Sequence, residues 1–373
     1  MPYQRLRNAR RVVVKVGSNV LTAQSSLNTN AIESISRQIC DLIDRGLEVL
    51  LVTSGALAAG LRKIGLDQRP DEIPQRQAIS ALGQSGLINA YEAAFGSCDK
   101  KVAQILLTSE DLNDRQRYLN ARNALNALLD WKVVPIINEN DTVMVEEIKL
   151  GDNDNLSAMI ALLMDADFLI NLTDIDGLYT KDPRTHADAQ LIPEVSVIKK
   201  EIETFASHIP GALGTGGMLS KIKAARKVTA AGVPMIIAKG DIPEILLKLF
   251  GGEKHGTYFV PKKEKMARRK CWIAYTLKPK GSLLLDDGAV NALINNGKSL
   301  LPIGITEVAG EFGVGSAVEF RDKDQHSLGI GLVNYTSTEI RAIMGLKTSQ
   351  IKERLGAKPY DEVIHRDNLV VTG

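Results

Sequence analysis

The sequence has few of the residues that build disulfide frameworks, metal centres or covalent active sites. Its three cysteines, Cys40, Cys98 and Cys271, are far apart and odd in number. They predict neither a disulfide framework nor a zinc site, and we expect free thiols. None of the five histidines stands in the loops described below, and no Ser-His-Asp or Cys-His arrangement is recognisable. We therefore predict no metal-ligating side chain and no covalent nucleophile.

Long apolar runs are also absent. No stretch approaches the ~20 apolar residues of a membrane-spanning helix, and the N-terminal segment MPYQRLRNARR leads directly into a strand-like run. We therefore expect a cytoplasmic protein without membrane association. The net charge of +2 argues against a surface coated with nucleic acid. With 373 residues, of which 44% are hydrophobic and 24% charged, the chain is long enough for two globular domains.

The first two-thirds of the chain alternates short β-branched runs with longer amphipathic stretches. This pattern is typical of strand-helix-strand units, and it predicts an α/β domain with three layers, αβα, around a mainly parallel sheet. The predicted strands are 11–16, 47–53, 102–108, 133–138, 167–173 and 233–239. The predicted helices are 30–44, 79–95, 120–131, 153–164 and 219–231, each with apolar residues three and four apart.

The alternation ends near Gly251, and residues 262–270 carry six basic side chains and one acid. We expect a first domain at 1–260, a linker at 261–279, a small β-rich barrel domain at 280–358 and a C-terminal tail at 359–373. The strand segments predicted after the boundary are AYTL (274–277), GSLLLDDGAV (281–290), SLLPIGITEVAGEF (299–312), GSAVEFRD (315–322) and LGIGLVNYT (328–336).

Two strand ends carry the first candidate site residues. Lys15 interrupts an apolar strand just before Gly17, and a buried ammonium group needs a partner. Because ligands of open α/β sheets bind at the carboxyl ends of the strands, we interpret Lys15 as a phosphate-binding residue; an ordinary lysine at a strand end is the alternative. Ser54, Gly55 and Ala56 follow the next strand, where small side chains let backbone N–H groups approach an anion. A routine strand-to-helix turn capped by Ser54 is the alternative for that segment.

Polar side chains gather further along the chain in two groups. One is NENDT at 138–142 and the other is GDNDN at 151–155, joined by the alternating segment VMVEEIKL, which predicts a hairpin. Asn and Asp are also common in turns, which is the alternative for both groups. Because the first group ends a strand and the second begins a helix, we expect Asp141, Asn153 and Asp154 to face one cleft. Such polar groups suit a zwitterionic amino acid.

Two later loops have features of phosphate sites. One begins at Thr173 and Asp174, directly after a strand, where Asx turns are the alternative. The other is the glycine-rich segment 214–218, which opens a helix containing Lys221, although the spacing is not that of a Walker A loop. Phosphoryl transfer to a carboxylate suits a site without a histidine base, because a carboxylate of pKa about 4 is already an ionised nucleophile.

The segments VVVKVGSNVLT, TSGALAAG, NENDTV, GDNDNLSA, TDIDGLYTKDPR and GTGGMLSKIKAA together resemble the bacterial glutamate 5-kinase family in order and spacing. The resemblance runs along essentially the whole chain, with Ser18 and Ser220 standing where threonine is frequent. It implies an amino-acid-kinase fold followed by a PUA domain, a fold better known in RNA-modifying enzymes. The implied reaction is ATP-dependent phosphorylation of the γ-carboxylate of L-glutamate, the first step of proline synthesis, with Mg²⁺ bound alongside the nucleotide.

The resemblance also implies residue roles. Lys15 and Lys221 would contact the transferring phosphoryl group, and Asp154 would orient both lysines without acting as a base. The implied glutamate-binding residues are Ser54, Gly55, Ala56, Asp141 and Asn153. The implied ATP-binding residues are Lys15, Thr173, Asp174, Thr215, Gly216, Gly217, Met218 and Lys221.

Partners and alternatives follow from the same resemblance. It implies inhibition by proline, a homo-oligomer, and a downstream glutamate-5-phosphate reductase that consumes the labile acyl phosphate. Within the same fold, acetylglutamate kinase and aspartokinase are the alternatives, and the C-terminal domain disfavours both. From a different class, the PUA-like domain and the basic segment 262–270 leave open an RNA-binding regulatory protein.

Overall fold

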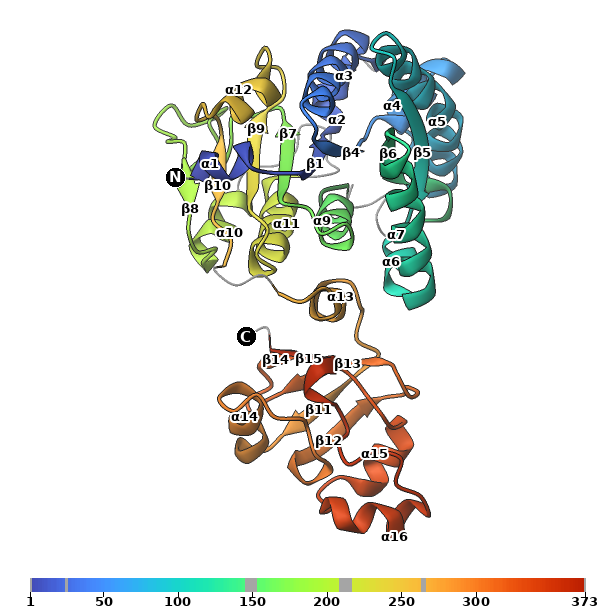
Figure 1. Ribbon diagram of the computed structural model, residues 1–373, viewed down its shortest axis with the longest axis vertical. Coiled ribbons are helices and arrows are strands. Elements are labelled where there is room, and N and C mark those ends of the chain that lie inside the picture. Colours follow the sequence, from blue (N-terminus) through green and yellow to red (C-terminus); the bar gives the residue numbers. More distant parts are fainter. Residues whose placement is uncertain (1, 24–25, 145–152, 208–216, 263–265, 372–373) are drawn as a thin grey trace. The chain divides into compact units, whose positions relative to one another are not determined.

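The computed structural model describes residues 2–23, 26–144, 153–207, 217–262 and 266–371 (Figure 1). The contacts divide the chain into two units, Met1–Lys265 and Met266–Gly373, each with a hydrophobic core of its own. These units differ from the predicted boundaries. The predicted linker contains helix α13 (Arg268–Tyr275), and the predicted tail contains strand β15 (Leu369–Val371).

The first unit is built on an eight-stranded sheet with the order β5-β6-β4-β1-β7-β9-β10-β8. Among the described residues its pairings are parallel except that of β9 with β10, so the predicted mainly parallel sheet is confirmed. The strands are β1 (Arg11–Val16), β4 (Glu48–Val52), β5 (Lys101–Leu107), β6 (Val133–Glu139), β7 (Phe168–Thr173), β8 (Glu194–Val195), β9 (Met235–Lys239) and β10 (Thr257–Phe259). A separate small ladder joins β2 (Thr22–Ala23) and β3 (Ser26–Leu27).

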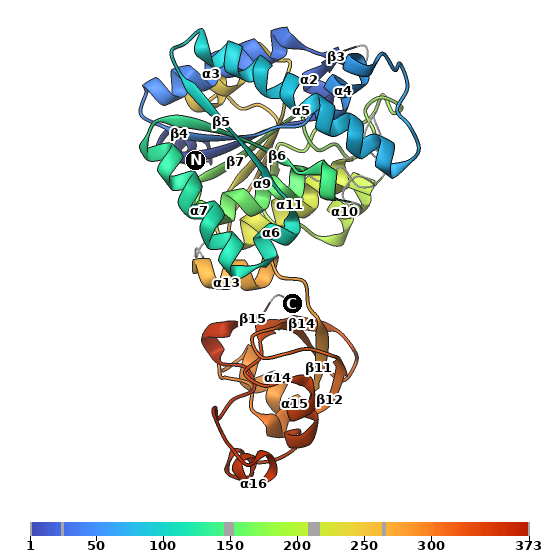
Figure 2. The ribbon, with the colours of Figure 1, turned by 90° about the vertical axis from the view of Figure 1, so that its right-hand side faces the viewer.

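Helices cover both faces of this sheet, which makes the three predicted layers (Figure 2). One layer holds α1 (Pro2–Arg7), α2 (Ser18–Leu21), α3 (Thr29–Asp44), α4 (Ala56–Ile64), α5 (Ile73–Gly96) and α12 (Ile245–Gly251). The other holds α6 (Ser109–Asn113), α7 (Arg115–Asp130), α9 (Asn153–Leu163), α10 (Lys200–Ser207) and α11 (Met218–Ala230). A 3₁₀ turn, η1 (Asp141–Val143), follows β6.

Strand β1 shows how the sequence places the site between the layers. Successive side chains of a strand point to opposite faces. Val12, Val14 and Val16 belong to the core shared with α3 and α5. The alternate position Lys15 therefore faces the layer that contains α9 and α11. Lys15 is thereby directed at the helices that carry the other candidate residues, although its neighbours in the strand are fully buried.

Helices α4 and α5 pack backbone against backbone at two glycines. A Cβ atom on Gly60 would lie 1.9 Å from the carbonyl oxygen of Ile79, and one on Gly83 would lie 1.8 Å from that of Ala56. Both distances are far below van der Waals contact, so any side chain at either position requires the helices to separate. This crossing fixes the start of α4 against the middle of α5.

The second unit contains a five-stranded mixed sheet with the order β12-β11-β13-β14-β15. The predicted strand at 274–277 is wrong. Ala274 and Tyr275 end helix α13, whose buried Cys271 and Trp272 lie at helical spacing from Tyr275. The predicted strand at 281–290 is a strand only as far as Leu285, because Asp286 caps a helix that begins at Asp287. The elements are α13, β11 (Gly281–Leu285), α14 (Asp287–Ile294), η2 (Pro302–Gly304), β12 (Ile305–Gly310), β13 (Ala317–Arg321), β14 (Ser327–Leu332), α15 (Ser337–Ile343), η3 (Thr348–Gln350), α16 (Ile351–Leu355), η4 (Arg366–Asn368) and β15.

Candidate active site

Three charged side chains predicted from the sequence meet at the carboxyl ends of the central strands. Lys15 Nζ lies 2.7 Å from Asp154 Oδ1, and Lys221 Nζ lies 3.2 Å from Asp154 Oδ2. Each lysine is 5% exposed and Asp154 is 1% exposed, so the contacts are shielded from water. They join the end of β1 with the first turns of α9 and α11. Two ammonium groups held at one point are suited to an anionic ligand such as a phosphoryl group.

Further donors hold Asp154 in this position. Asn171 on β7 donates from Nδ2 to Asp154 Oδ1 at 2.8 Å, and the hydroxyl of Ser220 lies 2.5 Å from Oδ2. Burial alone would raise the pKa of Asp154, but the ammonium groups of Lys15 and Lys221 and the hydrogen bonds from Lys15 and Ser220 hold it well below its usual range. This direction favours the ionised form of Asp154 between the two lysine ammonium groups.

Two helix N-termini open beside this cluster. Helix α4 begins after Gly55, which has φ 104°, and α11 begins after Gly217; neither glycine supplies a side-chain cap. The first-turn N–H groups of a helix lack partners within the helix and attract anions. The predicted residues Ala56 and Met218 are the first residues of these two helices and both are buried. The predicted Thr215 and Gly216 lie outside the described residues.

The predicted nucleotide residues Thr173 and Asp174 lie at the end of β7. Asp174 accepts hydrogen bonds from the hydroxyl of Thr173 at 3.0 Å and from Nδ2 of Asn19, on α2, at 2.8 Å. Burial alone would raise the pKa of Asp174, but these bonds and the nearby charge of Lys221 lower it. Asp174 is therefore within charge range of Lys221, which brings the two predicted nucleotide-binding segments together.

A chain of side-chain amides leads from Asp154 to the end of β4. Asn153, the neighbour of Asp154 on α9, donates from Nδ2 to Ser54 Oγ at 2.9 Å and to Asn138 Oδ1 at 3.2 Å. Among the described residues its other amide atom, Oδ1, is buried and has no hydrogen-bond partner. A buried acceptor of this kind is costly unless a ligand donates to it. The structure thus joins the predicted residues Ser54 and Asn153 beside the two lysines that contact Asp154.

Asp141 lies in η1, directly after β6. Burial raises its pKa to about 6, against the opposing effects of a hydrogen bond with Ser80 and the charge of Arg69. A cationic ligand would stabilise the ionised form of this carboxyl group, because the charge of the ligand would offset the cost of desolvation. The predicted hairpin at 143–150 falls almost wholly outside the described residues, and its first residue, Val143, ends η1.

The carboxylates near the lysines also test the fit of the magnesium ion that the resemblance implies. Both oxygens of Asp154 contact protein donors, and so do both oxygens of Asp174. Mg²⁺ takes oxygen ligands in octahedral geometry, retains several waters and is commonly bound through substrate phosphates. This donor set fits an ion carried mainly by phosphate oxygens.

Several residues of the site were missed by the sequence analysis. Asn171 is a polar residue inside an otherwise apolar strand, which is the signal that identified Lys15. Neither the composition nor a motif drew attention to Asn171. Ser80, Gln84 and Arg69 contact or influence the site from α5 and the segment before it. They gave no signal, because their positions in a helical pattern do not reveal which loop the helix will meet.

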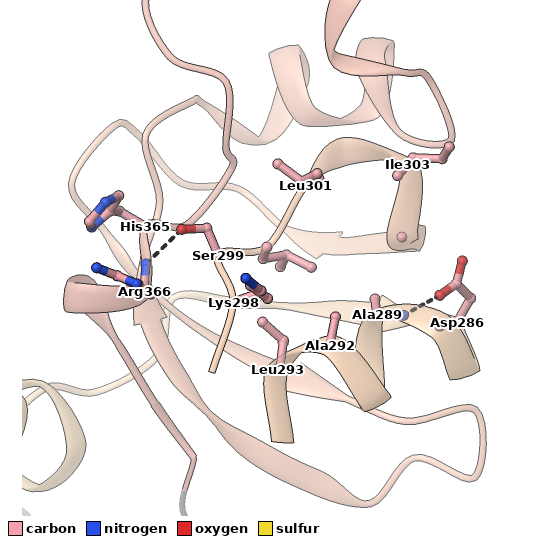
Figure 3. A pocket seen from close by; sticks show the side chains of 13 residues that line it. Asp286, Ala289, Ala292, Leu293, Lys298, Ser299, Leu301, Ile303, His365 and Arg366 are labelled. Carbon is pink, nitrogen blue, oxygen red and sulfur yellow. Dashed lines mark hydrogen bonds between the residues drawn. The ribbon is translucent and has the colours of Figure 1, made fainter. Parts of the chain in front are cut away.

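The second unit has a cavity of about 710 Å³ (Figure 3). Its lining is mainly apolar, while Lys298, His365 and Arg366 supply basic groups and Asp286 an acid. Ser299 Oγ accepts a hydrogen bond from the backbone N–H of Arg366 at 3.0 Å, which ties the two sides of the basic end together. The volume lies within the range of small-ligand sites.

Within the described residues, no helix has the length and apolar character needed to cross a membrane.

Comparisons with known proteins agree with these two units. Residues 10–239 match the model of the amino acid kinase family, and residues 281–355 match the PUA domain. Curated proteins named glutamate 5-kinase align along nearly the whole chain. That of Syntrophus aciditrophicus is 50% identical over 99% of this chain and 96% of its own length. That of Thermoanaerobacter sp. (strain X514) is 49% identical over 97% of each chain, and that of Geobacter sulfurreducens is 48% identical over 98% of each. The chain therefore belongs to the glutamate 5-kinase family of kinases, with an amino acid kinase domain followed by a PUA domain.

Proposed function

We propose that this protein transfers the γ-phosphoryl group of ATP to the γ-carboxylate of L-glutamate. The observation that carries the proposal is the contact of Lys15 and Lys221 with one buried carboxylate, Asp154, whose neighbour Asn153 is hydrogen-bonded to Ser54 and Asn138. The lysines suit a phosphoryl group, and the polar side chains around Asn153, together with Asp141, form the proposed glutamate pocket and suit an amino acid. Names of the relatives with about 50% identity support the same reaction.

In this mechanism a γ-carboxylate oxygen attacks the γ-phosphorus of ATP in line. A new C–O–P bond forms while the bond from phosphorus to the β,γ-bridging oxygen breaks, and ADP leaves with that electron pair. Lys15 and Lys221 offset the negative charge of the transferring group, and Asp154 keeps both ammonium groups in place. No general base is required, because the acceptor is ionised at neutral pH. Mg²⁺ on the nucleotide would offset further phosphate charge.

The α-amino end of glutamate is proposed to bind at the other end of the pocket. Asp141 supplies a carboxylate for the α-ammonium group, and Asn153 Oδ1 supplies an acceptor. Ser54 and the backbone N–H groups after Gly55 face the carboxylates of the substrate. N-acetylglutamate has no ammonium group, so its binding would leave Asp141 desolvated and unpaired. This contrast favours glutamate over the acetylated amino acid.

The reaction is tested by ADP formation with Mg-ATP and each of glutamate, N-acetylglutamate, aspartate and carbamate. Hydroxylamine traps any acyl phosphate as a hydroxamate. Hydroxamate that forms only with glutamate supports the proposal. Turnover with one of the other acceptors identifies a different kinase of the same fold, and no turnover with any acceptor contradicts kinase activity on these substrates.

Membership of the family supports three further proposals, namely a role in proline biosynthesis in the cytoplasm, inhibition by proline, and assembly as a homo-oligomer. The product would be consumed by a glutamate-5-phosphate reductase. Unchanged activity at millimolar proline rejects the inhibition, and a monomer mass in light scattering rejects the oligomer.

We propose RNA binding by the second unit as a second candidate function. The observation that favours it is the cavity with basic groups at Lys298, His365 and Arg366 in a domain that matches the PUA model. Phosphate contacts release counterions, so affinity for RNA would fall steeply with salt. Filter binding at several salt concentrations, with a Lys298→Ala/Arg366→Ala variant, tests this function. An RNA affinity unaffected by the double substitution contradicts binding at this cavity.

A further inference from the structure

Gln84 is a buried polar residue in the middle of α5, 8% exposed, and its hydrogen-bond partners are Gln104 on β5, at 3.5 Å, and two residues at the end of β6. Its Oε1 accepts a hydrogen bond from Asn138 Nδ2 at 3.2 Å. Its Nε2 donates to the backbone carbonyl of Glu139 at 3.3 Å. The carbonyl can only accept, so this bond fixes which end of the Gln84 amide faces Asn138.

The orientation of one amide fixes the next. With Nδ2 of Asn138 bound to Gln84, its Oδ1 accepts from the backbone N–H of Glu139 at 2.9 Å and from Asn153 Nδ2 at 3.2 Å. Asn153 therefore uses its donor end within the protein, also toward Ser54. Its acceptor end, Oδ1, is left buried and without a partner among the described residues. The open atom at this position is thus an acceptor.

We propose that Gln84 is a positioning residue for recognition of the α-ammonium group of the substrate. It acts by holding the Asn138 amide, which in turn presents Asn153 Oδ1 to the ammonium group. The inference rests on the proposed function, because it takes glutamate as the ligand of the pocket. It assigns Gln84 no contact with substrate and no part in phosphoryl transfer.

Replacement of Gln84 by methionine tests the inference, because methionine has nearly the same shape but cannot hold the Asn138 amide. Without that bond the donor of Asn138 is unpaired, and the Asn138 amide, which presents its oxygen to Asn153, loses one of the hydrogen bonds that hold it. The loss of a well-placed hydrogen bond predicts about a tenfold weaker affinity for glutamate. Turnover at saturating glutamate and ATP stays within about threefold of wild type, since the lysine cluster is untouched.

The distinguishing measurement compares glutamate with glutarate, which has the same two terminal carboxylates and no ammonium group. The dissociation constant of glutamate and the inhibition constant of glutarate are measured on wild type and on Gln84→Met. The inference expects a loss of about tenfold for glutamate and less than about twofold for glutarate. An equal loss for both ligands, or no loss for either, overturns it.

Gln38 provides a matched control on α3, away from the site. It is a glutamine 2% exposed that accepts from the backbone N–H of Leu246 at 2.9 Å and donates to the carbonyl of Ser34 at 3.1 Å. Gln38→Met therefore removes similar buried bonds and is expected to leave both affinities within about twofold of wild type. A loss specific to glutamate in this variant would show that general loosening of the fold suffices, which overturns the inference.

Asn138→Ala interrupts the same chain one step nearer the substrate and leaves Gln84 bonded to Glu139. It gives a second test if Gln84→Met does not fold, with the same selective loss for glutamate as the expected result and an equal loss for both ligands as the contrary one. If wild-type protein itself binds no glutamate, the proposed function fails and this inference with it. Binding by wild type with no selective loss in either variant overturns this inference alone.

Discussion

At the residue scale, Asp154 compensates the charge of the two lysines in the proposed phosphoryl-binding cluster and holds them in position. Its carboxylate is 1% exposed, and removal of a single partner from a buried ion cluster leaves the other charges uncompensated. Lys15 and Lys221 are held from opposite oxygens of the same carboxylate. Their ammonium groups are therefore fixed before a ligand arrives, which is the condition for electrostatic stabilisation of a transition state at no further cost in reorganisation.

Lys221→Ala is predicted to lower kcat by about 10²- to 10³-fold, the usual effect of removing one preorganised group that stabilises transition-state charge. The KM for glutamate stays within about threefold, because Lys221 contacts Asp154 and not the amide chain of the pocket. Lys223, exposed on the same helix, is the matched control, and Lys223→Ala keeps near wild-type kinetics. Steady-state assays measure both parameters. A higher KM with unchanged kcat would contradict the role assigned to Lys221.

The raised pKa of Asp141 predicts a pH limit on glutamate use. Burial raises this pKa to about 6. The ionised form is the one that pairs with an ammonium group, so kcat/KM for glutamate falls about tenfold per pH unit below the pKa. Asp141→Asn removes this dependence and raises the KM for glutamate at pH 7. The measurement is kcat/KM between about pH 5 and pH 8 on wild type and on Asp141→Asn. A decrease of kcat/KM at low pH that persists in the variant belongs to the titration of another group.

Ionisation of the Asp141 carboxyl group lowers the free energy of unfolding, whereas ionisation of a salt-bridged acid raises it. Its pKa is higher in the folded protein than its ordinary value of 3.8, so the folded state binds more protons between that value and about 6. The free energy of unfolding therefore decreases as the pH rises through this window. Thermal unfolding without glutamate should show Asp141→Asn more stable than wild type at pH 7, and this advantage should shrink toward pH 4. An unchanged difference across the window contradicts the linkage.

Sequence reasoning found the residues that break a pattern and missed those that fit one. Lys15 is conspicuous in an apolar strand, and Asp154 opens an apolar helix. Gln84 occupies an ordinary helical position, and the tertiary approach of α5 to β5 and to the end of β6 gives it its partners. Long-range hydrogen bonds between side chains depend on the relative placement of elements, which a single sequence does not specify.

At the element scale, the crossing of α4 and α5 connects packing to the site. Helix α4 begins at the predicted anion-binding turn, and α5 carries Ser80 and Gln84 toward the glutamate pocket. Gly60 and Gly83 let the two backbones touch, so the relative height of the helices is set by contact between main chains. Small residues after Ser54 indicated anion binding in the sequence; the structure gives Gly60 a separate role in helix packing.

Gly83→Ala and Gly86→Ala test this crossing within one helix. A Cβ on Gly83 would clash with the Ala56 carbonyl at 1.8 Å, whereas one on Gly86 meets its nearest atom, Ala59 Cβ, at 4.0 Å. Gly83→Ala is expected to cost about 2–3 kcal/mol of stability through overpacking, or more where the helices cannot separate. Gly86→Ala is expected to gain about 0.5–1 kcal/mol from helix propensity. Denaturant unfolding measures both; equal effects would contradict backbone contact at Gly83.

Periodicity predicted the major strands and helices, and its errors arose where elements are short or where their first turns are polar. Strand β1 has the predicted limits, and α3 and α9 differ from theirs by a residue. Helix α5 begins at Ile73, six residues before the predicted start, because its first turns are polar and gave no apolar repeat. The short run at 274–277 carried too few residues to distinguish a strand from the last turn of α13.

At the scale of the whole molecule, the described candidate residues of the phosphoryl and glutamate sites lie in the first unit, from Lys15 to Lys221. The second unit has a separate core that includes Leu283, Phe320 and Tyr335. The sequence predicts a domain boundary near 260, because the alternation of strands and helices ends near Gly251. It did not reveal that α13 and β15 pack together with β14, because these contacts join the two ends of the second unit.

The two cores predict that the units fold and function separately. A chain that ends at Lys265 retains the strands and helices that hold Lys15, Asp154 and Lys221, so glutamate-dependent ADP formation should persist with a kcat within about tenfold of the full chain.

A chain of residues 266–373 keeps α13 with β14 and β15 and should unfold cooperatively. A chain of residues 280–358, cut at the boundaries predicted from sequence, lacks both α13 and β15. It exposes the edge of β14 and should be less stable than 266–373 or aggregate. Calorimetry on the two C-terminal fragments decides between these boundaries. Equal stability of the fragments would contradict the structural role of α13 and β15, and complete loss of turnover in the 1–265 chain would show that the kinase site depends on the second unit.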